Sequence, residues 1–199
     1  GVATAARVAL ECDGKSAEGA SFTVQGLGAM GAAVVRYFAE YGGVLKSISD
    51  PRIGGTYHFP DGASDELVQA LTRGNFDVTT DFLGREKHQK ADGCDAPLFA
   101  DVDVTFPCAI QGVIHSDNVD QIKADYVCEG ANNPTSEQAR QALYKKDITV
   151  IPDFIANSGG IIAAYVELTS DVSPAENVKH RTNPENAKRM TIQRITENV

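Results

Sequence analysis

Three spaced glycines constrain this chain more than any other feature of its sequence. They belong to the run Gly26-Leu27-Gly28-Ala29-Met30-Gly31, which follows a short stretch rich in branched and aromatic residues (21–25) and opens an apolar stretch over 29–41. The first stretch predicts a strand and the second a helix. In such a turn the first glycine permits the tight bend, the second lets the backbone approach a diphosphate, and the third lets the helix pack closely. The run is therefore predicted to bind a dinucleotide at the helix N-terminus, where free N–H groups attract anions. The alternative is that the glycines only tighten the turn.

An acidic residue stands where such a site needs one. Asp50 ends the next predicted strand, over 45–49, at about 20 residues beyond the glycines,. Its carboxylate is expected to accept hydrogen bonds from both ribose hydroxyls of NAD and to repel a 2′-phosphate, so NAD is placed ahead of NADP. Two readings stay open: Asp50 as a solvated acid at a strand end, and Arg52 as a partner for the phosphate of NADP instead of a plain surface arginine.

Strand and helix patterns alternate along the rest of the chain. Further strands are predicted over 102–106, 126–128 and 148–151,. Helices are predicted over 1–11, from an N-cap at Ser64 to about Gly74, over 117–124, from the capping-box pair Thr135 and Gln138 to Lys146, and over 161–168,. Single helices between strands require parallel pairing with crossovers. The expected fold is α/β: a doubly wound, mostly parallel sheet of the Rossmann type, with helices on both faces.

The composition changes after this alternating region. Residues 1–169 are assigned to one NAD-binding domain, and residues 170–183 turn polar, which predicts a surface connection,. A polar helix with few apolar anchors is predicted over 185–198,. Residues 170–199 are therefore expected to be a linker and a C-terminal helix that packs on a preceding catalytic domain.

Charge and residue usage exclude several classes of protein. The 199 residues include 18 Lys and Arg against 27 Asp and Glu, a net charge of −9, which disfavours nucleic acid and anionic membrane surfaces as partners,. The four cysteines form no C-x-x-C pair and the four histidines lack metal-ligand spacing,. We therefore expect free thiols in a reducing cytoplasm and no metal site. No apolar run has the length of a membrane span.

Further motifs resemble the cofactor domain of the amino-acid dehydrogenases that act on glutamate, leucine, phenylalanine and valine. The resemblance covers residues 1–167 and rests on the glycine turn, Ser49-Asp50, Pro107-Cys108-Ala109, Glu129-Gly130-Ala131-Asn132, Asn133-Pro134-Thr135, Pro152-Asp153 and Asn157-Ser158-Gly159-Gly160. It implies that Cys108 and Ala109 leave room for the nicotinamide ring, and that Asn132 and Asn157 face the nicotinamide, its ribose or the substrate. By themselves, Asn132 also fits a turn residue and Asn157 a helix N-cap.

The resemblance also implies a reaction, oxidative deamination of an L-amino acid with hydride transfer to the nicotinamide. In the family a lysine and an aspartate of a preceding domain supply the general base, and that domain shares the amino-acid or 2-oxo-acid substrate. Nothing in this chain replaces them. We therefore expect no catalytic residue here, no turnover by this chain alone, and a homo-oligomer in the whole protein.

Two positions depart from the family pattern. Ala29 stands where asparagine is frequent, and Ala164 stands where the glutamate enzymes tend to carry serine, which weakens glutamate as the substrate. The segment over 129–135 resembles the glutamate branch more than the branched-chain one. Glutamate therefore stays the first candidate substrate by a narrow margin. A non-catalytic dinucleotide-binding module and the cofactor half of another two-domain oxidoreductase are the alternatives.

Overall fold

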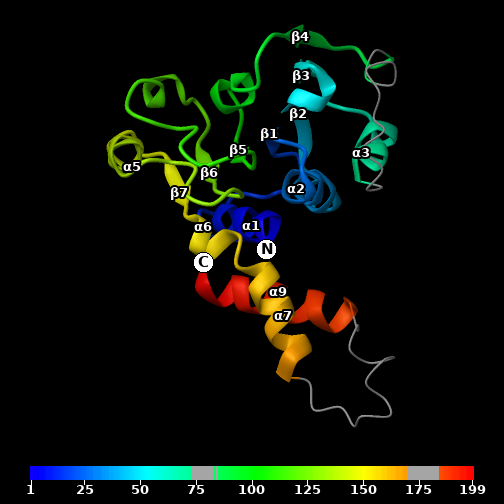
Figure 1. Cartoon of the computed structure of the whole chain (residues 1–199), viewed down its shortest axis with the longest axis vertical. Helices are drawn as coiled ribbons and strands as arrows, with labels where there is room; N and C mark the ends of the chain where they lie inside the picture. The colour runs from blue at the N-terminus through cyan, green and yellow to red at the C-terminus, as the bar shows by residue number, and fades with distance from the viewer. Residues whose placement is uncertain (73–82, 84, 170–183) are drawn as a thin grey trace.

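The glycine turn follows the central strand of a seven-stranded sheet, whose strands are labelled in Figure 1. The computed structural model describes residues 1–72, 83, 85–169 and 184–199. Its strands are β1 (Ser21–Gln25), β2 (Val44–Asp50), β3 (Gly55–His58), β4 (Gln89–Ala91), β5 (Val104–Pro107), β6 (Tyr126–Cys128) and β7 (Thr149–Ile151), in the order β4-β3-β2-β1-β5-β6-β7. The pairs β1–β2, β1–β5, β5–β6 and β6–β7 are parallel, and β3 and β4 add an antiparallel edge. The expected α/β fold with a mostly parallel sheet is confirmed, whereas β3 and β4 were not predicted.

The helices begin and end close to the predicted positions in most places. They are α1 (Val2–Cys12), α2 (Ala29–Glu40), α3 (Asp65–Thr72), α5 (Glu137–Lys145), α6 (Asp153–Ala156), α7 (Gly159–Thr169) and α9 (Pro184–Asn198), with short 3-10 turns η1 (Pro51–Ile53), η2 (Ala96–Phe99) and η3 (Val119–Gln121). Ser64 caps α3 as expected, since its Oγ accepts from the N–H of Leu67 at 3.1 Å. The predicted end of that helix at Gly74 and the connection over 170–183 lie outside the described residues.

Two helix predictions were wrong in detail. Only η3 forms within 117–124, because the Asn118 side chain binds the backbone of Val113 and His115 and competes with helical hydrogen bonds,. The cap of α5 is Ser136, whose Oγ accepts from the N–H of Ala139 at 3.2 Å. Thr135 is fully buried and forms a β-bridge with Ile114, so its backbone is already engaged.

Apolar side chains cover both faces of the sheet. Tyr126 and Cys128 belong to a cluster shared with α1, α2 and α3, whereas Val127 belongs to a second cluster shared with α5. Because successive strand residues point to opposite faces, the two clusters lie on opposite sides of the sheet. In the larger cluster, edge-to-face contacts join Phe22, Phe38 and Phe106 at centroid distances of 5.0 to 6.0 Å and pack α2 against β1 and β5,.

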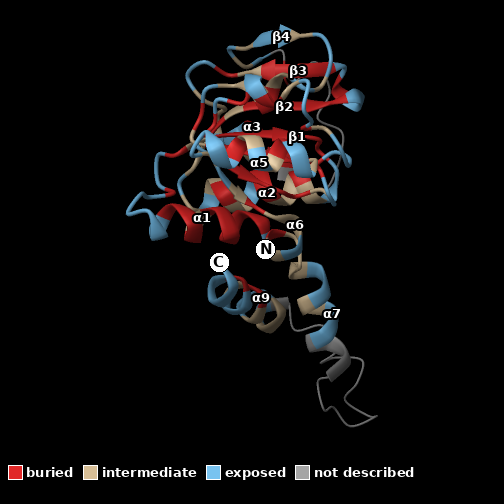
Figure 2. Ribbon diagram, turned by 90° about the vertical axis from the view of Figure 1, so that its left-hand side faces the viewer, coloured by how far each residue is buried: buried red, intermediate tan, exposed pale blue. Residues whose placement is uncertain are grey.

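The last helix packs on this same chain. Helix α9 contacts α7 and α1, and its Ile195 is fully buried there. Figure 2 shows that the strands and α1 are mostly buried, while much of α7 and α9 is exposed. Packing of α9 on a preceding domain therefore stays a prediction for its exposed side. Within the described ranges, no helix combines the length and apolar character needed to cross a membrane.

Candidate functional site

The site is built at the point where the strand order reverses. Strand β1 pairs with β2 on one side and with β5 on the other, so the carboxyl ends of β1 and β5 border the crevice in which open α/β sheets bind ligands,. The glycine turn follows β1, and Cys108 and Ala109 follow β5. All six predicted turn residues therefore lie at this crevice.

Two of the three glycines are required by the fold itself. Gly26 has a φ of +87°, and a Cβ there would lie 2.7 Å from the Cα of Ala109, so the loops after β1 and β5 touch. At Gly31 a Cβ would collide with the carbonyl oxygen of Gly26. Gly26 therefore permits the tight bend and Gly31 lets α2 pack closely, the two structural roles that the spacing predicted.

Gly28 has no such structural requirement. It is the N-cap of α2 with φ −63°, and a Cβ built on it would have no heavy atom of the described residues within 4 Å. Gly28 and Ala29 are exposed, and among the described residues no side chain caps the N-terminus of α2. The open space and the uncapped N–H groups are the features that a bound diphosphate needs. The residues present therefore fit this part of a dinucleotide.

Asp50 is tied to the same turn. Its side chain is only 10% exposed. One oxygen, Oδ2, accepts from the N–H of Leu27 at 2.9 Å, and the other, Oδ1, accepts from the N–H and Nε of Arg52, both at 2.9 Å. Burial alone would raise the pKa of Asp50, but the bonds from the Arg52 side chain and from the N–H groups of Arg52 and Leu27 outweigh it and lower the pKa to about 2. Arg52 is thus not a plain surface arginine.

The predicted nicotinamide residues line one cleft. It has a volume of about 700 Å³ and is bordered by Met30, Cys108, Ala109, Ile110, Gln111, Gly130, Ala131, Asn132, Asn157, Gly160 and Ile161. Burial raises the pKa of the Cys108 thiol to about 12, so this sulfur is a neutral wall of the cleft at pH 7,. A Cβ at Gly130 would collide with Sγ of Cys108. Small residues here are needed for packing as well as for space.

The two predicted asparagines meet at the edge of this cleft. Asn157 Nδ2 donates to Oδ1 of Asn132 at 2.8 Å and, at 3.4 Å, to the carbonyl oxygen of Gly130. Asn132 comes from the loop after β6, and Asn157 from the junction of α6 and α7, 25 residues later. The pair forms a polar edge on an otherwise mostly apolar wall.

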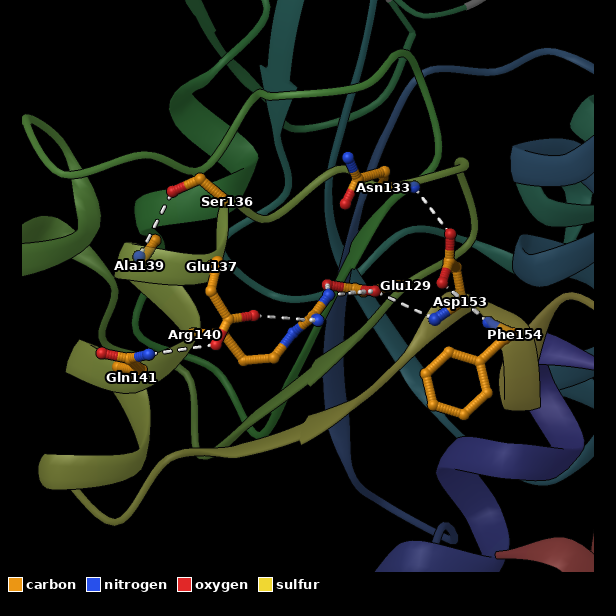
Figure 3. A network of polar contacts seen from close by, with 9 residues as sticks. All are labelled: Glu129, Asn133, Ser136, Glu137, Ala139, Arg140, Gln141, Asp153 and Phe154. Atoms are coloured by element: carbon orange, nitrogen blue, oxygen red, sulfur yellow. Dashed lines mark hydrogen bonds and ion pairs between the residues drawn. The ribbon is translucent and has the colours of Figure 1, made fainter.

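A buried ion pair fixes these two segments, and sequence reasoning missed it (Figure 3). Glu129 is fully buried and accepts from Nη2 of Arg140 at 3.1 and 3.2 Å and from the N–H of Asp153 at 2.9 Å. Asp153 in turn accepts from the N–H of Asn133 at 2.7 Å. The backbone of Asn133 has a positive φ of +48°. Glu129 therefore links the loop that carries Asn132 to the start of α6. The available signal was an acid directly after a buried strand, with an arginine on the next helix.

Known proteins are similar to this chain over most of its length. The profile of the family Glutamate/Leucine/Phenylalanine/Valine dehydrogenase matches residues 1–198. Glutamate dehydrogenase of Aeropyrum pernix is 37% identical over 84% of this chain and 38% of its own length. The NADP(+)-dependent glutamate dehydrogenase of Pyrobaculum calidifontis is 34% identical over 84% and 39%, and the NAD-specific glutamate dehydrogenase A of Halobacterium salinarum is 35% identical over 81% and 35%.

A solved structure supports the fold. Plasmodium falciparum glutamate dehydrogenase superposes with a TM-score of 0.78 over 98% of this chain and 42% of that chain, at 18% identity. The chain thus spans about two fifths of the length of the curated relatives, 38% in the first of them. Since the family profile covers nearly every residue, the chain belongs to the glutamate/leucine/phenylalanine/valine dehydrogenase family.

Proposed function

We propose that this chain is the nicotinamide-dinucleotide-binding part of an amino-acid dehydrogenase, with L-glutamate as the leading substrate and NAD ahead of NADP. The open space at Gly28 carries the proposal. The fold needs no glycine at that position, whereas a diphosphate resting on the N-terminus of α2 does. Relatives named as NAD-specific and as NADP(+)-dependent glutamate dehydrogenases support a nicotinamide cofactor and leave NADP as the alternative.

Each part of the crevice has a distinct role in this proposal. The N–H groups at the start of α2 hold the diphosphate, and Asp50 with Arg52 binds the adenosine sugar. Asn132 and Asn157 offer amide donors and acceptors to the nicotinamide half, while the neutral thiol of Cys108 and the small side chain of Ala109 leave space for its ring. When bound, the cofactor accepts a hydride from Cα of the amino acid.

The remaining parts of the reaction lie outside these residues. We assign the general base to a preceding domain that shares the substrate, and we expect the whole protein to be a homo-oligomer. Glutamate leads because the relatives named above are glutamate dehydrogenases. Ala164 on α7 offers no hydroxyl to a distal carboxylate, so another L-amino acid is the second candidate.

Titration of NADH fluorescence with the chain and with its Gly28→Val variant tests the proposal. The variant should lose NADH binding while its free energy of unfolding in urea stays within about 1 kcal/mol of the parent chain's value, since Val is only a poorer N-cap. Unchanged NADH affinity in the variant would remove the glycine turn from the site. The chain alone should not reduce NAD with glutamate, whereas the intact protein should, and NADH binding without turnover by the intact protein would favour a non-catalytic module.

A further inference from the structure

A second cavity lies next to the nicotinamide cleft, where four helices meet. It has a volume of about 290 Å³, near the lower end of the range for small-molecule sites,. Its lining comes from the segments 1–4 at the start of α1, 30–41 of α2, 157–163 at the start of α7, and 187–192 of α9. Met30, Asn157 and Gly160 also line the nicotinamide cleft, so the two spaces share one wall. The cofactor roles proposed above use none of the other lining residues.

Small side chains keep this space open. Ala3, Ala33, Ala163 and Ala187 line it, each from a different helix. A Cβ built on Gly160 would have no heavy atom of the described residues within 4 Å. Protein interiors otherwise leave few voids larger than a water molecule, whereas this one equals the liquid volume of about ten water molecules. The apolar part of the cavity therefore has room for a short aliphatic chain.

Three hydroxyl groups give the cavity a polar side. Thr191 is only 9% exposed, and within the described part of the chain its hydroxyl has no hydrogen-bond partner. The hydroxyl oxygens of Thr4 and Tyr41 lie 3.2 Å apart and share one hydrogen bond. Each hydroxyl has one proton, so this bond leaves one of the pair's two protons to donate elsewhere. Because buried polar groups usually have partners, these hydroxyls indicate a ligand that carries acceptor atoms.

The charge of the lining favours an anion. Among the described residues that line the cavity, Lys188 has the one charged side chain, although the whole chain has a net charge of −9. Its Nζ lies 5.3 Å from the centroid of the Tyr37 ring, and it has no acidic partner in the described ranges. Lys188 is exposed at the edge of the cavity, and Thr191, three residues later, lies on the same face of α9,.

We propose that this cavity is a second binding site, for a small carboxylate with an aliphatic body. The carboxylate lies between the ammonium of Lys188 and the hydroxyl of Thr191, since a charged donor and a neutral donor suit its two oxygens. The aliphatic body lies among the four alanines. This site is separate from that of the dinucleotide, and it goes beyond the proposed function.

Calorimetric titration of the chain with hexanoate tests the proposal. Hexanoate should bind saturably, whereas acetate, which lacks the aliphatic body, and hexylamine, which has the opposite charge, should bind at least about tenfold more weakly. Lys188→Met should weaken hexanoate binding about tenfold and Thr191→Val about fivefold, as expected for a charge-assisted and a neutral hydrogen bond. Lys145→Met is the matched control and should change nothing, since Lys145 is also exposed and ends α5.

The two methionines of the chain report where hexanoate binds. Met30 lines the cavity, whereas Met190 lines a separate groove beside α6, α7 and α9. In NMR spectra of isotope-labelled methionine methyl groups, hexanoate should shift the Met30 signal and leave the Met190 signal in place. Saturating NADH should not displace hexanoate.

Four results would overturn the proposal. They are the absence of saturable binding, equal losses of affinity in Lys188→Met and Lys145→Met, a shift of Met190 alone, and competition between hexanoate and NADH. The third result would place hexanoate in the groove, and the fourth would place it in the nicotinamide cleft. Hexanoate binding to a chain that fails to bind NADH would support this site while the proposed function falls, so the two proposals are tested separately.

Discussion

Replacing Glu129 by glutamine leaves the guanidinium of Arg140 beside a neutral amide in a fully buried position. Glu129 is 0% exposed and accepts three hydrogen bonds, two from Arg140 and one from the N–H of Asp153. Within the described part of the chain, the buried Nε of Arg140 has no hydrogen-bond partner, so Glu129 supplies the buried compensation for this guanidinium. The substitution keeps the shape of the side chain, removes its charge and replaces one of its two acceptor oxygens by an NH2 donor.

The expected cost follows from the burial of the two partners. Removing one partner of a buried ion pair costs about 3 to 5 kcal/mol. Arg140 is 32% exposed, so water compensates part of its charge, and the glutamine oxygen still accepts from Asp153. We therefore expect a loss of about 2 to 3 kcal/mol in the free energy of unfolding. For a domain of this size the melting temperature should fall by roughly 4 to 12 °C.

The same arginine provides a matched control. Glu137 also pairs with Arg140 (Figure 3). Its Oε2 lies 3.8 Å from Nη1 of Arg140, but the Glu137 side chain is 67% exposed. Glu137→Gln should change the stability by less than about 0.5 kcal/mol, as exposed pairs usually do. Urea unfolding of both variants gives the two values. Equal losses of unfolding free energy in the two variants, or no loss in Glu129→Gln, would refute the conclusion that buried Glu129 compensates the charge of Arg140.

Ligand binding separates positioning from stability. Glu129 fixes the segments that carry Asn132 and Asn157, so Glu129→Gln should weaken NADH binding about fivefold, or ~1 kcal/mol. The variant should bind ADP-ribose, which lacks the nicotinamide, as tightly as the parent chain does. Parallel losses for both ligands would mean that Glu129 acts on the whole crevice and not on the nicotinamide end.

Three further expectations concern other parts of the chain. Gly31→Ala should destabilise the fold by about 3 kcal/mol or more in urea unfolding, because the new methyl group meets the carbonyl oxygen of Gly26, whereas Gly28→Ala should cost under about 1 kcal/mol,. Asp50 has a pKa lowered to about 2, so its contribution is present above its unfolded value of 3.8 and is lost as the pH falls towards 2,. A pH series of unfolding should show the parent chain losing up to about 2 kcal/mol more than Asp50→Asn between pH 5 and 2. Ile195→Ala should cost about 2 to 4 kcal/mol if α9 unfolds together with the sheet, and an unchanged urea midpoint would show that it does not,.

Periodic apolar patterns were enough to predict the central strands and the parallel pairing. The turn after β1 has a glycine spacing that few other structures require, and β5 and β6 are short runs of buried residues. In β7 only Ile151 is buried, but its residues are apolar or β-branched,. The antiparallel strands β3 and β4 could not be predicted in the same way. They are four and three residues long, and β4 reads Gln89-Lys90-Ala91, whose polarity fits an edge rather than a core strand,.

In the site, the sequence located residues but not their partners. The glycine spacing and the position of Asp50 predicted which elements meet at the crevice. Arg52 reaches Asp50 because the 3-10 turn η1 folds the chain back directly after Asp50. Such a short turn leaves no periodic pattern in the sequence from which it could be predicted. The pairing of Glu129 with Arg140 joins a strand end to a helix face, and only the folded sheet brings them together.

The contrast among the three glycines has a practical consequence. If a library of variants were selected only for yield of folded protein, positions 26 and 31 would stay glycine while position 28 would accept many residues. If the same library were selected for cofactor capture, position 28 would become as restricted as the other two. The difference between the two tolerance profiles at this one position would measure how much of the motif serves the ligand and how much serves the architecture.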